Sequence, residues 1–124
     1  MTSAHGPVIG KRVLVVEDDY FIAKGLARSL KASGADVLGP VATVADALEL
    51  IEAGPLDGAV LDINLRGGDF VYPVADALTE RDVPFIFATG YSSKAIPPRY
   101  AGIARCEKPV ETDAFIQALF SPTR

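Results

Sequence analysis

The stretch Gly58-Ala59-Val60-Leu61-Asp62-Ile63-Asn64 decides how the rest of this 124-residue chain is interpreted. Its small and apolar residues, from Gly58 to Leu61, are typical of a strand that is buried on both faces. Asp62 is the first residue that would emerge from this strand, at the rim of the sheet. We therefore expect Asp62 to act chemically, and we interpret the other polar motifs by their relation to it.

The length and composition indicate one folded domain. A chain of 124 residues with 49% hydrophobic and 23% charged residues can bury a sizeable core without metal or disulfide cross-links. Residues 1–10 contain Gly, Pro and Ser without hydrophobic periodicity, which predicts a flexible tail. The domain is then expected to occupy residues 11–124.

The charge and the cysteine content exclude several classes of protein. A net charge of -4 gives no electrostatic reason to bind nucleic acid. Cys106 is the only cysteine, so no internal disulfide can form, and a reducing, cytoplasmic location is expected. The sequence contains no export signal and no apolar run long enough to cross a bilayer, so we expect no membrane association.

Short apolar runs alternate with segments of helical periodicity along the chain. The runs predict strands, and the apolar spacings i, i+3, i+4 and i+7 predict helices between them. Pro97-Pro98 removes two backbone donors, so the segment 91–102 is expected to hold only a short or partly unwound helix. The expected strands are 12–16, 35–38, 58–61, 84–88 and 103–106, and the expected helices begin near residues 20, 44, 71 and 112.

Five strands separated by helices predict an open α/β fold with a parallel five-stranded sheet and helices on both faces. We expect the flavodoxin-like strand order 2-1-3-4-5. In such sheets the site forms at the carboxyl ends of the strands, near the point where the strand order reverses. The polar residues of the sequence can be tested against that rule.

The chemistry-bearing residues fall at the ends of four strands. Glu17-Asp18-Asp19 ends the first, Asp62 the third, Thr89 the fourth and Lys108 the fifth. Polar residues end many strands simply because strands end at water, but the convergence of acids, a hydroxyl and an ammonium group at one rim is more specific. At about 4 Å and an effective dielectric near 20, two carboxylates repel by roughly 4 kcal/mol, so positive charge must compensate them.

Lys108 supplies one positive charge, and a hard divalent cation can supply the rest. Mg²⁺ fits a site of carboxylates, a carbonyl and a phosphoryl oxygen. We expect Asp18 and Asp62 to be direct ligands, Glu17 to bind through water, and the backbone carbonyl of Asn64 to face the ion. The sequence therefore predicts a magnesium site built around Asp62.

Phosphoryl transfer is the reaction that suits these residues. An aspartate can attack a phosphorylated donor and form an acyl phosphate. The transfer depends mainly on positioning and charge stabilisation, which Mg²⁺ and Lys108 can supply. A hydrogen bond from the Thr89 hydroxyl to the phosphoryl group could pull its loop inward and change the surface.

These motifs, in this order and at strand ends, resemble those of a response-regulator receiver domain of two-component signalling. The resemblance covers Lys11 to Phe120. Val-Val-Glu17-Asp18-Asp19 resembles the acidic pocket, Leu61-Asp62 the phosphoacceptor, Thr89 the switch hydroxyl, and Lys108-Pro109 the lysine and its following proline. Phe-Ala-Thr-Gly at the end of the fourth strand further resembles a receiver subgroup whose fourth helix is often poorly formed.

The chain also departs from the general receiver pattern. Receivers commonly carry an aromatic residue three positions before the lysine, and this chain has Arg105 there. Gly90 replaces a bulkier residue after the switch hydroxyl, which should increase mobility at that point. Signal output through Arg105, or through Tyr91 moving with its loop, is therefore open, and an ordinary core or surface role is the alternative for Tyr91.

The resemblance implies a phosphorylation-controlled binding module rather than an enzyme with substrate turnover. His5 is the only histidine and lies in the expected tail, so the phosphohistidine donor is expected to be a sensor histidine kinase or a histidine phosphotransfer protein. Only Ser121 to Arg124 follow the last expected helix. Output is then expected through a downstream protein partner, and a phosphate sink or relay is the alternative.

Two further functions are alternatives to this one. A Mg²⁺-dependent phosphatase of the haloacid dehalogenase type also uses a strand-end aspartate, but it needs a second acid two residues later, and position 64 is Asn. A degenerate receiver that binds partners without phosphate would not need the acids, the hydroxyl and the lysine together. Both alternatives are disfavoured by the residues present.

Overall fold

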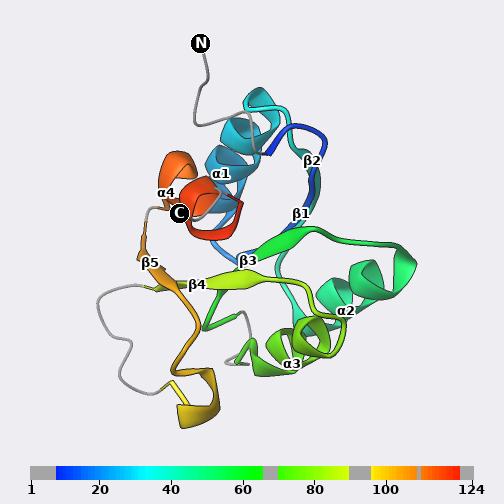
Figure 1. Ribbon diagram of the computed structural model, residues 1–124, viewed down its shortest axis with the longest axis vertical. Coiled ribbons are helices and arrows are strands. Elements are labelled where there is room, and N and C mark those ends of the chain that lie inside the picture. Colours follow the sequence, from blue (N-terminus) through cyan, green and yellow to red (C-terminus); the bar gives the residue numbers. More distant parts are fainter. Residues whose placement is uncertain (1–7, 66–69, 90–95, 109, 121–124) are drawn as a thin grey trace.

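The computed structural model describes residues 8–65, 70–89, 96–108 and 110–120 (Figure 1). Strands and helices alternate along the chain, as the sequence predicts. The strands are β1 Arg12–Val16, β2 Asp36–Val41, β3 Gly58–Asp62, β4 Phe85–Thr89 and β5 Arg105–Glu107. The helices are α1 Tyr20–Ala32, α2 Val44–Ala53, α3 Tyr72–Glu80 and α4 Thr112–Leu119.

The five strands form one parallel sheet in the order β2-β1-β3-β4-β5. This order confirms the expected flavodoxin-like α/β fold. The order reverses between β1 and β3, which pair with Val16 opposite Leu61. The carboxyl ends of these central strands therefore lie side by side at the switch point, where a site is expected.

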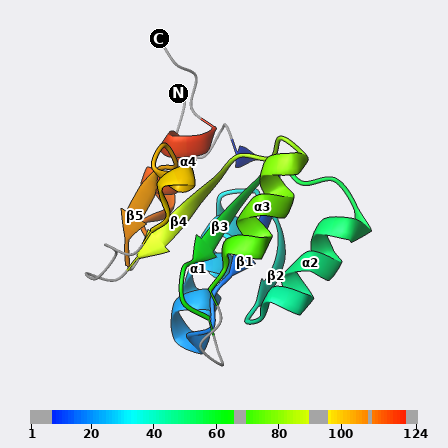
Figure 2. The ribbon, with the colours of Figure 1, turned by 90° about the horizontal axis from the view of Figure 1, so that it is seen from below.

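The helices form a layer on each face of the sheet (Figure 2). On one face, α1 and α4 pack on a core that includes Val13, Val15 and Val60, with Leu30 and Phe115 from the helices. On the other face, α2 and α3 cover a core that includes Leu14, Leu61, Phe87, Val74 and Leu78. The alternation of side chains along each strand thus fills two cores and fixes the strand ends between them.

Local signals in the sequence set the helix boundaries. The Thr43 side chain accepts a hydrogen bond from the Asp46 backbone N–H at 3.1 Å, so Thr43 is the N-cap that the sequence predicts for α2. Pro73 lies in the first turn of α3, where its missing N–H costs no intrahelical bond. Both expectations for these helices are confirmed.

The second strand is longer than predicted. The sequence favoured an end at Gly39-Pro40, but β2 continues through both residues to Val41. Leu14 to Val16 of β1 faces Leu38 to Val41 of β2, so one extra residue of β2 is accommodated in an irregular pairing. Gly39 has φ +90°, and a Cβ there would lie 2.9 Å from the Val15 carbonyl oxygen, so glycine is needed at this bulge.

The segment before β5 was predicted only in part. A single 3₁₀ turn at Pro98–Tyr100 confirms that no regular α-helix passes through Pro97-Pro98, and residues 90–95 lie outside the described part of the chain. The strand expected at 103–106 is shifted to Arg105–Glu107. The reason is that the Ile103 N–H bonds to the Tyr100 carbonyl, which places Ile103 in the turn.

The packed part of the chain begins before the expected boundary at Lys11. Val8 is fully buried in the core beneath α1 and α4. Gly10 donates its backbone N–H to the Gly34 carbonyl at 2.8 Å. Residues 8–10 are therefore attached to the domain, and only residues 1–7 of the expected tail lie outside the described residues.

Candidate functional site

The strand ends bring the sequence-predicted residues to one rim of the sheet. Asp62 is opposite Ala88 in the β3–β4 pairing, and Thr89 is opposite Glu107 in the β4–β5 pairing. The Lys108 backbone N–H continues this ladder by donating to the Thr89 carbonyl at 2.8 Å. Asp62, Thr89 and Lys108 thus follow one another across three neighbouring strands.

Lys108 lies between two buried carboxylates. Its Nζ is 3.0 Å from Asp62 Oδ1, 3.2 Å from Glu17 Oε1 and 3.3 Å from Glu17 Oε2. The side chains of Glu17 and Asp62 are only 4% and 7% exposed, so water screens these contacts poorly. The ammonium group therefore compensates part of the negative charge that the strand ends gather.

Backbone contacts hold Glu17 in place. Its N–H donates to the Val41 carbonyl of β2 at 2.9 Å, and its Oε2 accepts from the Asp19 N–H at 3.0 Å. Asp19 itself caps α1, because its Oδ1 accepts from the Ile22 N–H at 3.0 Å. Of the three consecutive acids, Asp19 thus caps the helix, while Glu17 and Asp18 lie beside Asp62.

Glu17, Asp18 and Asp62 form an acidic cluster. One carboxylate oxygen from each residue lies within 4.8 Å of the other two. An all-oxygen set of this spacing fits a hard divalent cation, and two of its members are buried while Asp18 is partly exposed. The cluster could therefore hold a metal ion at the edge of solvent.

Asn64 follows the site along the chain. It is exposed and forms an antiparallel bridge with Phe70. The hydrogen bond of that bridge runs from the Val71 N–H to the Ile63 carbonyl at 2.9 Å, and so it does not use the Asn64 carbonyl. The role of the Asn64 carbonyl as a metal ligand stays a prediction.

The surroundings of Asp62 shift its acidity strongly. Burial, together with the hydrogen bond and negative charge of Glu17, raises the pKa of Asp62 from 3.8 to about 7, although Lys108 opposes the shift. Burial alone would lower the pKa of Lys108, but the Asp62 and Glu17 carboxylates raise it above its ordinary value. A further cation beside Asp62 would favour its ionised form.

Of the remaining predicted site residues, the structure describes Thr89 and Arg105 but not Tyr91. Thr89 is 6% exposed at the end of β4, in line with the site. Arg105 is exposed on the edge strand β5, opposite Phe87 and two residues before the strand reaches the rim. Tyr91 and Gly90 lie outside the described residues, so the hypothesis of output through Tyr91 stays a prediction.

The sequence patterns did not predict an aromatic cluster that includes Tyr100 of the segment 96–104. The Tyr100 ring stacks on Tyr72 at 5.1 Å and meets Phe87 edge-on at 5.7 Å. Its hydroxyl donates to Asp76 of α3, and Arg99 also pairs with Asp76 at 3.3 Å. No local pattern reveals contacts between residues so far apart in the sequence, although Tyr100 lies two residues after the unusual Pro97-Pro98 pair.

The described helices give no sign of a membrane span. None of them combines the length and the apolar character that crossing a bilayer requires.

Comparisons with known proteins agree with the observed fold. No family model matches the chain. Its sequence is 41% identical to SdrG from Sphingomonas melonis Fr1, whose solution structure superimposes with a TM-score of 0.78 over 95% of this chain and 96% of that one. A second structure, the BeF3-activated conformation of SdrG, gives 39% identity over 96% of each chain and a TM-score of 0.72.

Two further relatives are more distant. The receiver (REC) domain of the PhyR response regulator from Erythrobacter litoralis is 28% identical, with a TM-score of 0.74 over 96% of this chain and 99% of that one. The transcriptional regulatory protein PdtaR from Mycobacterium tuberculosis is 25% identical over 91 residues, which are 73% of this chain. The match spans 44% of PdtaR, so this chain corresponds to less than half of that relative.

Proposed function

We propose that this chain, which belongs to the response-regulator receiver family, accepts a phosphoryl group on Asp62 from a phosphohistidine donor and signals the change to a protein partner. The observation that carries the proposal is the position of Asp62. Its carboxylate is buried at the end of β3, bonded to Lys108, and part of the acidic cluster with Glu17 and Asp18. Support also comes from SdrG, which has a BeF3-activated conformation.

The phosphoryl transfer forms one bond and breaks one bond. A carboxylate oxygen of Asp62 forms a bond to phosphorus while the P–N bond of the donor breaks, and the electron pair returns to the donor imidazole. Lys108 is placed to stabilise the phosphoryl oxygens, since its Nζ already lies 3.0 Å from Asp62. Thr89 would donate its hydroxyl to another of these oxygens.

We propose that the acidic cluster holds Mg²⁺, with Asp18 and Asp62 as direct ligands, Glu17 through water, and the Asn64 carbonyl as a further ligand. When bound, Mg²⁺ supplies positive charge for the carboxylates and for the phosphoryl group. The raised pKa of Asp62 supports this role, because a nucleophilic carboxylate must be ionised and a pKa of about 7 leaves part of the Asp62 population protonated at neutral pH.

The test is modification of Asp62. With Mg²⁺ and either a small phosphodonor or beryllofluoride, the wild type should give a shifted band on a phosphate-affinity gel, or amide shifts around the site, and Asp62→Asn should give neither. Asp82→Asn is the matched control, since Asp82 is exposed and has φ 58°, which asparagine tolerates. An equal response from wild type and Asp62→Asn would show that the phosphoacceptor is assigned wrongly.

The same proposal includes signal output through a protein partner and no catalytic turnover of a separate substrate. Position 64 is Asn, so the site has no second acid two residues after Asp62 to protonate a leaving group, and we expect no phosphatase turnover of added phosphate esters. A partner that binds only in the presence of beryllofluoride would identify a switch. A protein that exchanges phosphate but shows no state-dependent partner would instead be a sink or relay.

A further inference from the structure

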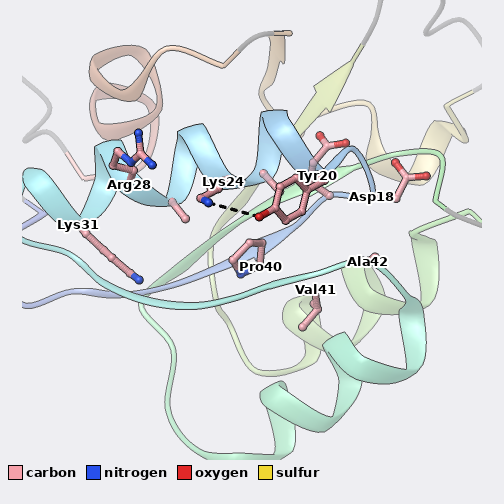
Figure 3. Close-up of a pocket in the computed structure, with 11 residues that line it drawn as sticks. Asp18, Tyr20, Lys24, Arg28, Lys31, Pro40, Val41 and Ala42 are labelled. Atoms are coloured by element: carbon pink, nitrogen blue, oxygen red, sulfur yellow. Dashed lines mark hydrogen bonds between the residues drawn. The ribbon is translucent and has the colours of Figure 1, made fainter.

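A groove runs between helix α1 and strand β2, next to the acidic cluster (Figure 3). We call it the α1–β2 groove. Its volume is about 610 Å³, and its apolar surface comes from Ala23 and Ala27 of α1 and from Pro40 and Val41 of β2. Because β2 is the edge strand of the sheet, the groove lies at the side of the domain, where another chain can approach it.

Three cations of α1 line this groove. Lys24, Arg28 and Lys31 are four and three residues apart, which places them on one side of the helix. Figure 3 shows them along α1, with Pro40 and Val41 on the opposite side of the groove. The helix has no acidic residue, although the whole chain has a net charge of -4. The α1 side of the groove is thus a basic strip, formed by these three cations, on an acidic protein.

The cations are not neutralised by the described part of the protein. Within those residues, neither Arg28 nor Lys31 forms an ion pair, and both are exposed. Lys24 forms no ion pair with another described residue, and its Nζ lies 3.3 Å from the Tyr20 hydroxyl and 5.5 Å from the centre of the Tyr20 ring. Like charges at these helical spacings repel one another, so the strip works against the stability of α1. An external anion would relieve this repulsion.

The shape of the strip favours a linear occupant. Lys24 and Lys31 are about 10 Å apart along the helix axis, which corresponds to roughly three residues of extended chain. Alternate side chains of an extended segment point the same way and lie about 7 Å apart, so two acidic residues separated by one residue can meet two of the cations while the residue between them meets another surface. Glu17 and Asp18 line the other end of the groove and would repel acids there.

We propose that the α1–β2 groove binds an extended acidic segment of a partner protein, with its carboxylates along Lys24, Arg28 and Lys31 and its uncharged side chains on Ala27, Pro40 and Val41. The groove adjoins the acidic cluster through Glu17 and Asp18, but Asp62 does not line it. Its occupation does not require a phosphoryl group on Asp62, so it adds a second contact for a partner rather than restating the proposed function.

The experiment measures binding of a fluorescently labelled peptide of alternating glutamate and valine by anisotropy. The double variant Arg28→Gln, Lys31→Gln should weaken binding about five- to tenfold at low salt, because two surface ion pairs are lost. The double variant Lys11→Gln, Arg81→Gln changes the net charge equally outside the groove, and it should weaken binding by less than about twofold. Glutamine keeps helix propensity, so α1 should remain folded.

Further controls identify the occupant. A peptide with glutamine in place of glutamate should bind more weakly, and added salt should weaken binding of the glutamate peptide. The amide shifts that the glutamate peptide causes should map to residues 23–31, 41 and 42. Asp62→Asn should bind the peptide like the wild type, which separates this site from the phosphoacceptor. Equal loss in both double variants, stronger binding of a single-stranded oligonucleotide than of the peptide, or self-association through this face would overturn the proposal.

Discussion

Lys108 illustrates how one residue controls the charge of the site. Its Nζ is within 3.3 Å of an oxygen of both Glu17 and Asp62, which are buried. Removing one partner of a buried charged set leaves the others uncompensated, which usually costs more than the set contributed. The lysine therefore matters both to stability without metal and to the response to a phosphoryl group.

We predict different effects of Lys108→Ala on these two properties. The variant should lose about 1–3 kcal/mol of stability without metal at neutral pH, because two carboxylates lose their cation. Its beryllofluoride-induced amide shifts should weaken more than its Mg²⁺ affinity, since the acids hold the metal. Urea unfolding and Mg²⁺ titration measure the two effects, and Lys11→Ala is the exposed control. Equal loss of both properties would contradict this division of roles.

At the level of single residues, the sequence identified the site but not the separate tasks of its acids. Glu17, Asp62 and Lys108 were predicted because each follows an apolar run, and the structure brings them into contact. Asp19 looked like a third acid of the pocket, yet its side chain caps α1. The three-residue spacing to Ile22 is the local signal for that cap, but two acids beside it masked the signal.

At the level of elements, the 3₁₀ turn Pro98–Tyr100 is connected to α3 by the side chains of Tyr100 and Arg99. The Tyr100 hydroxyl donates to Asp76, and its ring stacks on Tyr72. The hydrogen bond from Tyr100 is the main cause that lowers the pKa of Asp76, and Arg99 adds to it. The cluster therefore attaches the segment before β5 to α3, the helix that follows β3.

We predict that Tyr100→Phe weakens this attachment without removing the ring packing. The pKa of Asp76 should rise toward its ordinary value, and stability should fall by about 1 kcal/mol, the usual effect of one lost hydrogen bond. Carboxyl NMR titration and urea unfolding measure these changes. Tyr20→Phe is the matched control, because Tyr20 is 63% exposed. An unchanged Asp76 titration in Tyr100→Phe would contradict the assigned cause.

The bounds of a strand were predictable where the strand is buried along its whole length, and they were less predictable for the two edge strands. β1, β3 and β4 were predicted within one residue, because central parallel strands are continuous apolar runs. The edge strands β2 and β5 were misplaced by one to three residues. Gly39-Pro40 is accommodated by a bulge that no local pattern predicts, and the start of β5 is set by a turn that depends on Tyr100.

For the whole molecule, the site makes folding depend on pH. Asp62 has a pKa of about 7 in the folded protein and 3.8 as an ordinary side chain. Between these values the folded state binds more protons than the unfolded state, so stability falls as pH rises through this window and is level above it. The raised pKa of Lys108 acts in the alkaline range, because its contribution is present below its ordinary value of 10.5 and is lost above it.

The last prediction follows from this linkage. Without metal, raising the pH from about 4 to about 7 should lower the stability of the wild type relative to Asp62→Asn, by an amount of order 2 kcal/mol, because only the wild type must ionise a buried acid. Saturating Mg²⁺ at pH 7.5 should restore about 2–3 kcal/mol to the wild type and much less to Asp62→Asn, because a ligand of the folded state stabilises it. Urea unfolding at several pH values, with Asp82→Asn as the control, measures both effects. Parallel pH curves for wild type and Asp62→Asn would show that Asp62 ionises normally, and the metal would then not be needed to bring it into its reactive form.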